Sequence, residues 1–169
     1  MHQTALYSKE FYLQNIEIAQ KYLAHFHMMM NPDSVCMDCC YFPSFGERAF
    51  YMQVQFENAH FTGHCVYTDY ADYLGIQSRS VNFLEIEQAN QHPAMRGDVF
   101  CKIIPLNTAL IEQLTAETKC YKPKTRNGIT IDGVYANIRL FEHGAETANI
   151  RAAHDDAVIS LLSAIAKQL

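Results

Sequence analysis

Apolar and polar residues follow a helical spacing in some segments of the chain and a period of two in others. From the capping residue Ser8 onward, apolar side chains recur every three or four positions, which predicts an amphipathic helix over about residues 8–30. Pro32 ends this pattern, because proline disfavours helix at the residue before it. The same spacing predicts four further helices, over residues 69–75 and 81–91, after Asn107 or Thr108, and after Asp155 or Asp156.

A period of two predicts two β-hairpins. Residues 50–56 alternate in polarity, and after a turn within residues 58–63 a second strand is expected over residues 64–68. Near the end of the chain, residues 134–141 and 146–152 alternate in the same way, joined by a turn at Glu142-His143-Gly144. Each pair of segments is therefore expected to form an antiparallel hairpin.

Two segments lack this alternation. The apolar run over residues 99–104 predicts a well-buried strand, and residues 34–47 are interpreted as a loop. Helices and hairpins without a regular βαβ rhythm indicate the α+β class: an antiparallel sheet of two or more hairpins packed against a long N-terminal helix and a C-terminal helix. At 169 residues and 19.3 kDa, with no repeat or long linker, the chain is expected to form a single domain, 1–169.

Composition narrows the functional classes. Hydrophobic residues make up 49% of the chain, enough for a core that needs no disulfide, and the six cysteines are expected to be reduced. No secretory signal or membrane-spanning run is visible in the sequence, so we expect a cytoplasmic protein that binds no membrane. A net charge of -5 argues against a nucleic-acid partner. The acidic excess lies in residues 1–100, which carry eleven acidic and five basic residues.

One segment of that acidic part predicts a protein-binding surface. Tyrosines offer large contact areas with a polar tip, and neighbouring carboxylates steer a basic partner toward them. The alternative is that the tyrosines pack inward and the first aspartate only caps a helix. The candidate partner-binding residues are Tyr67, Asp69, Tyr70, Asp72 and Tyr73, with Glu85 and Glu87 extending the surface.

Cysteine and histidine pairs suggest a competing metal site. Cys36 and Cys39, followed by His60 and His64, offer the thiolate and imidazole ligands that zinc prefers, and Cys40 and Cys65 lie nearby. The gap between the two pairs is longer than in a zinc finger. On one extended strand His60 and His64 would lie ~13 Å apart, too far for one ion unless the chain folds back.

A cysteine nucleophile is a second chemical alternative. Cys39 or Cys40, beside Asp38, could pair with an imidazole from His60, His64 or His143 if the fold brought the two together. The sequence shows no phosphate-binding loop, dinucleotide fingerprint, zinc-protease motif or nucleophile elbow. Nothing in it therefore makes a positive case for an enzyme.

The C-terminal third resembles a known class of proteins. Residues 131–141 (IDGVYANIRLF), a hairpin and residues 155–162 (DDAVISLL) are similar to the ends of small bacterial proteins of unknown function, including immunity proteins encoded beside polymorphic toxins. The resemblance implies a cytosolic, acidic protein that blocks a toxin, and it carries over no catalytic residue.

These observations favour a non-enzymatic protein-binding module, of the kind exemplified by toxin-neutralising immunity proteins. Its expected partner is a protein, such as a basic toxin domain, and no cofactor is expected. The alternative is a zinc-binding protein or cysteine-dependent enzyme centred on Cys36, Cys39, Cys40, His60 and His64. The sequence leaves self-association open.

Overall fold

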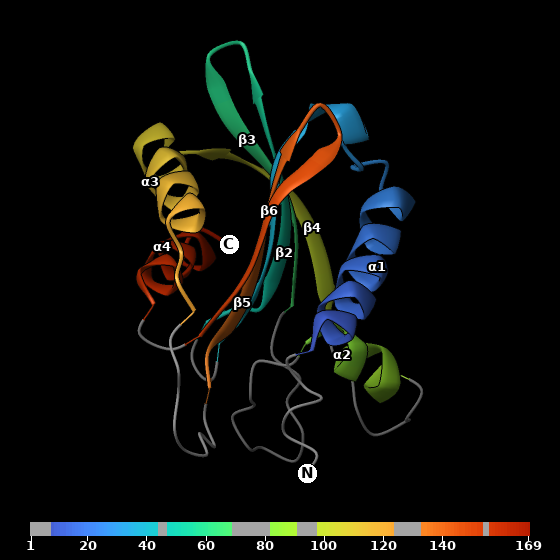
Figure 1. Ribbon diagram of the computed structural model, residues 1–169. Coiled ribbons are helices and arrows are strands. Elements are labelled where there is room, and N and C mark those ends of the chain that lie inside the picture. Colours follow the sequence, from blue (N-terminus) through green and yellow to red (C-terminus); the bar gives the residue numbers. More distant parts are fainter. Residues whose placement is uncertain (1–7, 44–46, 69–81, 91–97, 124–132, 154–155) are drawn as a thin grey trace.

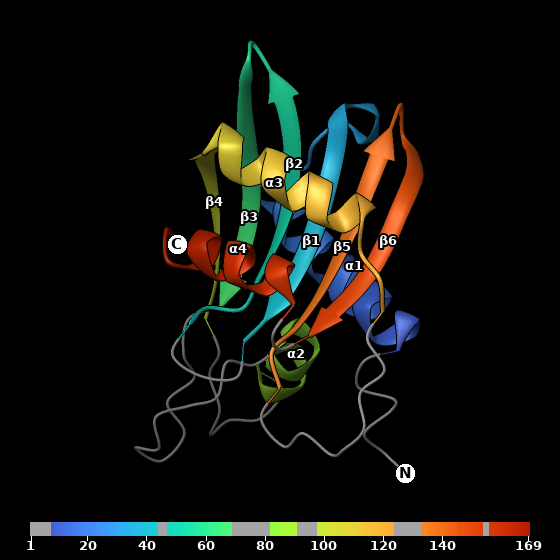
Figure 2. The same ribbon diagram turned by 60° about the vertical axis from the view of Figure 1, so that its left-hand side comes forward.

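The protein is an α+β fold built on one six-stranded antiparallel sheet. The computed structural model describes residues 8–43, 47–68, 82–90, 98–123, 133–153 and 156–169. The strands are β1 (Val35–Phe42), β2 (Phe50–Glu57), β3 (His60–Thr68), β4 (Val99–Leu106), β5 (Tyr135–Glu142) and β6 (Ala145–Ala153). Their order across the sheet is β4-β3-β2-β1-β5-β6, so β4 and β6 are the two edges, as Figure 2 shows.

Helices cover both faces of the sheet (Figures 1 and 2). The helices are α1 (Lys9–His25), α2 (Phe83–Asn90), α3 (Thr108–Lys119) and α4 (Ala157–Ala166), with a short 3₁₀ turn at Pro32–Ser34. On one face α3 and α4 lie across the strands, and on the other α1 and α2 do. We refer to these as the α3/α4 face and the α1/α2 face. The expected fold class is confirmed, with the N- and C-terminal helices on opposite faces.

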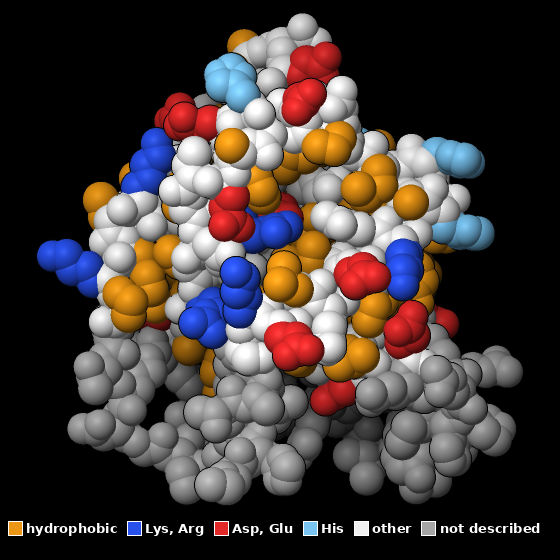
Figure 3. All heavy atoms as spheres, turned by 45° about the vertical axis from the view of Figure 1, so that its right-hand side comes forward, with side chains coloured by type: hydrophobic (Ala, Val, Ile, Leu, Met, Phe, Trp, Pro, Cys, Tyr) orange, Lys and Arg blue, Asp and Glu red, His pale blue; other side chains and the backbone are white. Residues whose placement is uncertain are grey.

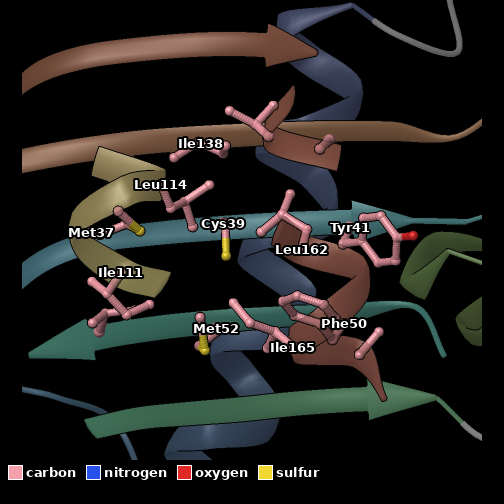
Figure 4. Close-up of a cluster of buried hydrophobic side chains, with 14 of the residues drawn as sticks. Met37, Cys39, Tyr41, Phe50, Met52, Ile111, Leu114, Ile138, Leu162 and Ile165 are labelled. Carbon is pink, nitrogen blue, oxygen red and sulfur yellow. The ribbon is translucent and has the colours of Figure 1, made fainter. Parts of the chain in front are cut away.

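Each face carries its own apolar core. On the α3/α4 face the central strands contribute side chains such as Met52 and Ile138, which meet Leu114 and Leu162 of the two helices (Figure 4). On the α1/α2 face an aromatic cluster centred on Phe42 packs against the helices. Because both faces are covered, the middle of the sheet is shielded from water on both sides.

Helix α1 begins where the sequence predicted and ends earlier. The Ser8 Oγ accepts a hydrogen bond from the Phe11 N–H, so Ser8 is the expected N-cap. The helix was expected to extend to about residue 30, but it stops at His25. His27 takes a positive φ of 57°, and the Met28 N–H donates to the Leu23 carbonyl at 2.7 Å. This is the bonding pattern of a Schellman helix end, formed here without glycine.

The expectation of a loop over residues 34–47 is wrong for most of that segment. Residues 35–42 form β1, a central strand between β2 and β5. Seven of the eight β1 residues are buried, because helices cover both faces. A strand buried on both sides has no alternation of polar and apolar residues, so the signal for a half-exposed strand is missing.

Both hairpin turns use left-handed backbone at their two central residues. Asn58 and Ala59 have φ of 52° and 64°, and His143 and Gly144 have φ of 50° and 79°. These angles correspond to tight two-residue turns that match the twist of paired strands. The first turn is therefore shorter than the expected turn within 58–63, and β3 starts at His60 rather than at His64.

Strand β4 lies at an edge instead of in the buried interior expected for residues 99–104. Six of its eight residues are exposed or half-exposed, and only Ile104 and Leu106 are buried. The helix expected over 69–75 lies outside the described residues. Within the described residues, no helix is long and apolar enough to cross a membrane.

Candidate functional site

The structure places one residue of the predicted tyrosine-rich surface and leaves four outside the described part. Tyr67 is half-buried near the end of β3, and its ring stacks on Phe100 of β4 with centroids 5.6 Å apart. The Arg48 guanidinium lies 5.2 Å from the centre of the same ring. Tyr67 is thus partly enclosed by neighbours. Asp69, Tyr70, Asp72 and Tyr73 lie outside the described residues.

The two glutamates proposed to extend that surface are exposed on α2. Glu85 and Glu87 both lie toward solvent. Burial raises the pKa of Tyr22 on α1, and the nearby Glu87 carboxylate and Cys101 thiol raise it further. Glu87 is an exposed acidic group on α2, on the face of the sheet where Cys101 of β4 also projects.

Strand β4 exposes large apolar side chains on both of its faces. Phe100 is 42% exposed and faces the same side as Tyr67, its partner across β3 and β4. Ile103 is 50% exposed and pairs with His64, which projects on the α1/α2 face. These two apolar side chains are exposed on an edge strand that also carries the exposed Lys102 and Pro105, two residue types common at strand edges.

The segment that follows α1 lies beside β3, next to the residue that pairs with Ile103. The His64 Nδ1–H donates to the Met28 carbonyl, which brings residues 26–29 next to the His64–Ile103 pair. Phe26 and Met29 are 52% and 38% exposed. We call the exposed Phe100 and Ile103, with Tyr67 beside Phe100, the β4 surface.

The β4 surface combines two features that proteins use to bind other proteins. A strand at the edge of a sheet presents backbone N–H and C=O groups to which an incoming strand can pair. Apolar side chains that flank this edge give the incoming strand area to bury. The sequence did not reveal this surface, because an apolar run such as residues 99–104 is interpreted as buried.

The predicted zinc ligands are not brought together. Cys39 projects into the core on the α3/α4 face, among Leu114 and Leu162 (Figure 4), whereas His64 projects on the opposite face. Cys36 occupies a bulge in β1, where its Sγ–H donates to a backbone carbonyl, and His60 is exposed at the hairpin turn. In the described part of the chain, no three or more histidine, cysteine or acidic residues cluster in a way that could hold a metal ion.

The cysteines proposed as nucleophiles are poorly suited to that chemistry. Burial raises the pKa of Cys39 and Cys40 well above the ordinary value, and the neighbouring Asp38 raises both further. Burial also raises the pKa of Cys65 to about 12. A thiol reacts as its thiolate, so these three side chains are held in the unreactive form at neutral pH.

A buried ion pair that the sequence did not predict lies on the α1/α2 face. Asp38 on β1 and Arg139 on β5 are register partners, and the guanidinium donates from Nε to Asp38 Oδ1 at 2.8 Å and from Nη2 to Oδ2. The Tyr51 hydroxyl donates to the same carboxylate at 2.9 Å and accepts from Gln20 of α1 at 3.1 Å. This network fixes α1 to the sheet, and its charges neutralise each other.

Comparisons with protein-family models, with curated proteins and with solved structures found no match to this chain.

Proposed function

We propose that this protein is a non-enzymatic protein-binding module that receives an extended strand of a partner protein along β4. The observation that carries the proposal is the edge strand β4, which exposes Phe100 on one face and Ile103 on the other. A partner strand added here would gain backbone hydrogen bonds and would bury apolar side chains on both faces of the sheet.

The charge on β4 favours a different protein, rather than a second copy of this chain, as the source of the partner strand. Lys102 lies in the middle of β4 and is exposed. An antiparallel pair of β4 strands from two copies, centred on Lys102, would place the two Lys102 side chains directly opposite each other on one face of the sheet. Like charges in such positions destabilise strand pairing.

The finer proposal is a toxin-neutralising immunity protein with a basic partner. Its support is the resemblance of the C-terminal third, the net charge of -5 and the exposed Glu87 on the α1/α2 face. Carboxylates at the margin of an interface speed association with a basic protein and favour it over acidic ones. The proposal that the protein neutralises a toxin is based only on the resemblance of the C-terminal third to immunity proteins.

A photo-cross-linking residue at position 103 tests the proposal, with the same residue at position 13 as the matched control. Leu13 is 44% exposed on α1 and faces β5 and β6, at the edge of the sheet opposite to β4. We expect a partner protein to be captured in the source cells from position 103 and not from position 13. The partner's affinity for purified protein should then fall about 30-fold in Ile103→Asp and stay within about threefold in Leu13→Asp.

Three outcomes would overturn the proposal. They are capture only of a second copy of the chain, equal capture from both positions, and a partner whose affinity is unchanged by Ile103→Asp. A thermal unfolding curve of each variant checks that a lost affinity does not arise from a lost fold. Salt dependence tests the charge argument separately, since steering by carboxylates weakens as ionic strength rises.

A further inference from the structure

A cavity opens between α1 and the strands at the other edge of the sheet, away from β4. Its volume is about 270 Å³. Lys9, Tyr12 and Leu13 of α1 line one wall, and polar side chains of β5 and β6 line the other. Figure 3 views this side of the molecule and shows a hollow in which basic and acidic side chains lie next to each other.

The backbone explains why polar groups gather in this cavity. Asn137 of β5 pairs with Arg151 of β6, so both side chains project on the same face, as does Asn149 two positions before Arg151. On β5, the neighbouring residues Leu140 and Phe141 pair with Ala148 and Glu146 of β6. Thr147, between these two β6 residues, has no register partner on β5 and forms a bulge. This bulge turns Glu146 onto the cavity face as well.

Asn137 contributes a buried amide to the cavity wall. The residue is only 4% exposed, and its amide nitrogen donates to Asn149 Oδ1 at 2.7 Å and to the Ile150 carbonyl at 2.9 Å. Both partners are acceptors, so the orientation of the amide is fixed. Its Oδ1 receives no hydrogen bond from a described residue. A buried acceptor left in this way is destabilising unless a ligand or water supplies the donor.

The charges of the cavity are arranged in two groups. Lys9 and Arg151 are positive. Glu146 is negative, accepts a hydrogen bond from Asn149 at 3.2 Å and lies 4.0 Å from the Arg139 guanidinium. Glu146 and Arg151 are five residues apart on β6, so these two charges lie toward different ends of the cavity. Tyr12 and Leu13 provide apolar area along α1.

We propose that this cavity binds a small zwitterion with the size of an amino acid or a dipeptide. The carboxylate of the ligand would pair with Lys9 and Arg151, and its amino group would donate to Asn137 Oδ1 or to Glu146. Apolar atoms of the ligand would contact Leu13. The volume suits a ligand of this size and is smaller than the usual range for drug-sized molecules.

Calorimetric titration with L-leucine and with the dipeptide glycyl-leucine tests the proposal on the whole chain. N-acetylated and C-amidated forms of each probe remove one charge at a time. We expect one of the free zwitterions to bind, and each blocked form to bind at least about tenfold more weakly. Leucine and the dipeptide are separate arms, so the preferred length follows from their comparison.

Exposed charged residues provide the variants. Arg151→Gln and Lys9→Gln should each weaken binding about tenfold, whereas Lys21→Gln, on the same helix outside the cavity, should leave it unchanged. No heat of binding up to about 10 mM of either probe would overturn the proposal. Equal binding of free and blocked probes would also do so, as would equal weakening by Lys21→Gln. The cavity and β4 are at opposite edges of the sheet, so failure here leaves the β4 proposal untouched.

Discussion

The ion pair between Asp38 and Arg139 offers the sharpest test of how the two faces of this sheet are stabilised. The side chain of Asp38 is 3% exposed and that of Arg139 is 15% exposed. Replacing Arg139 by methionine keeps an unbranched apolar stem of similar length and removes both guanidinium hydrogen bonds. Asp38 would then keep only the Tyr51 hydroxyl as a donor among its present partners.

The expected loss of stability is large because a buried carboxylate would remain without a countercharge. Breaking a buried pair from one side typically costs about 3–5 kcal/mol, compared with about 0–1 kcal/mol for a pair on the surface. A single domain is stable by about 5–15 kcal/mol in total, so Arg139→Met should remove a substantial fraction. The double variant Asp38→Leu with Arg139→Met removes both charges and should recover most of the loss.

Urea unfolding followed by far-ultraviolet circular dichroism measures this effect without the salt that guanidinium would add. With a slope of about 2 kcal/mol per molar urea, the midpoint of Arg139→Met should fall by about 2 M. The double variant should be more stable than the single one. A loss below about 1 kcal/mol in Arg139→Met, or a double variant less stable than the single one, would refute the reasoning.

Three further predictions follow from the backbone and the thiols. Ala59→Gly should raise the free energy of unfolding by up to about 1 kcal/mol, because Ala59 has a φ of 64°. Gly144→Ala should lower it by more, since an added Cβ would also meet the Asp33 carboxylate at 2.8 Å. Urea midpoints measure both effects, and an opposite sign in either variant would contradict the turn geometry. In the folded protein a maleimide should modify the exposed Cys120 first, and peptide mass spectrometry that finds Cys65 modified at the same rate would contradict the burial assigned to it. Ionisation of Cys65 should leave stability unchanged below pH 9 and lower it between about pH 9 and 12, because the thiol ionises near pH 9 in the unfolded chain while burial raises its folded pKa to about 12. Cys65→Ala should make this decline less steep. An unchanged slope in the variant would contradict the prediction.

Helix starts and hairpins are the features of this fold that could be predicted from the sequence. Ser8 and Asn107 cap α1 and α3 with the side-chain hydrogen bonds expected of such residues. The alternation of polar and apolar residues along the strands predicted the two hairpins, because side chains on the two faces of each strand differ in polarity. These signals lie within a few residues of one another, so a single sequence is enough to show them.

Pairings between distant segments could not be predicted. Asp38 is 101 residues away from Arg139, and only the register of β1 with β5 makes them partners. Without that partner, Asp38 in the sequence looks like a loop residue, which is one reason why β1 was missed. The apolar residues of β4 predict burial equally well for a central strand and for an edge, and only the topology of the sheet distinguishes the two.

The most direct test of binding at β4 is hydrogen–deuterium exchange of the captured complex, compared with that of the free protein. If a partner strand pairs with β4, the outward-facing amides of residues 99–104 should exchange more slowly in the complex, while those of β6, at the other edge, should be unchanged. Slower exchange confined to residues 145–153, or no change at residues 99–104, would contradict the account.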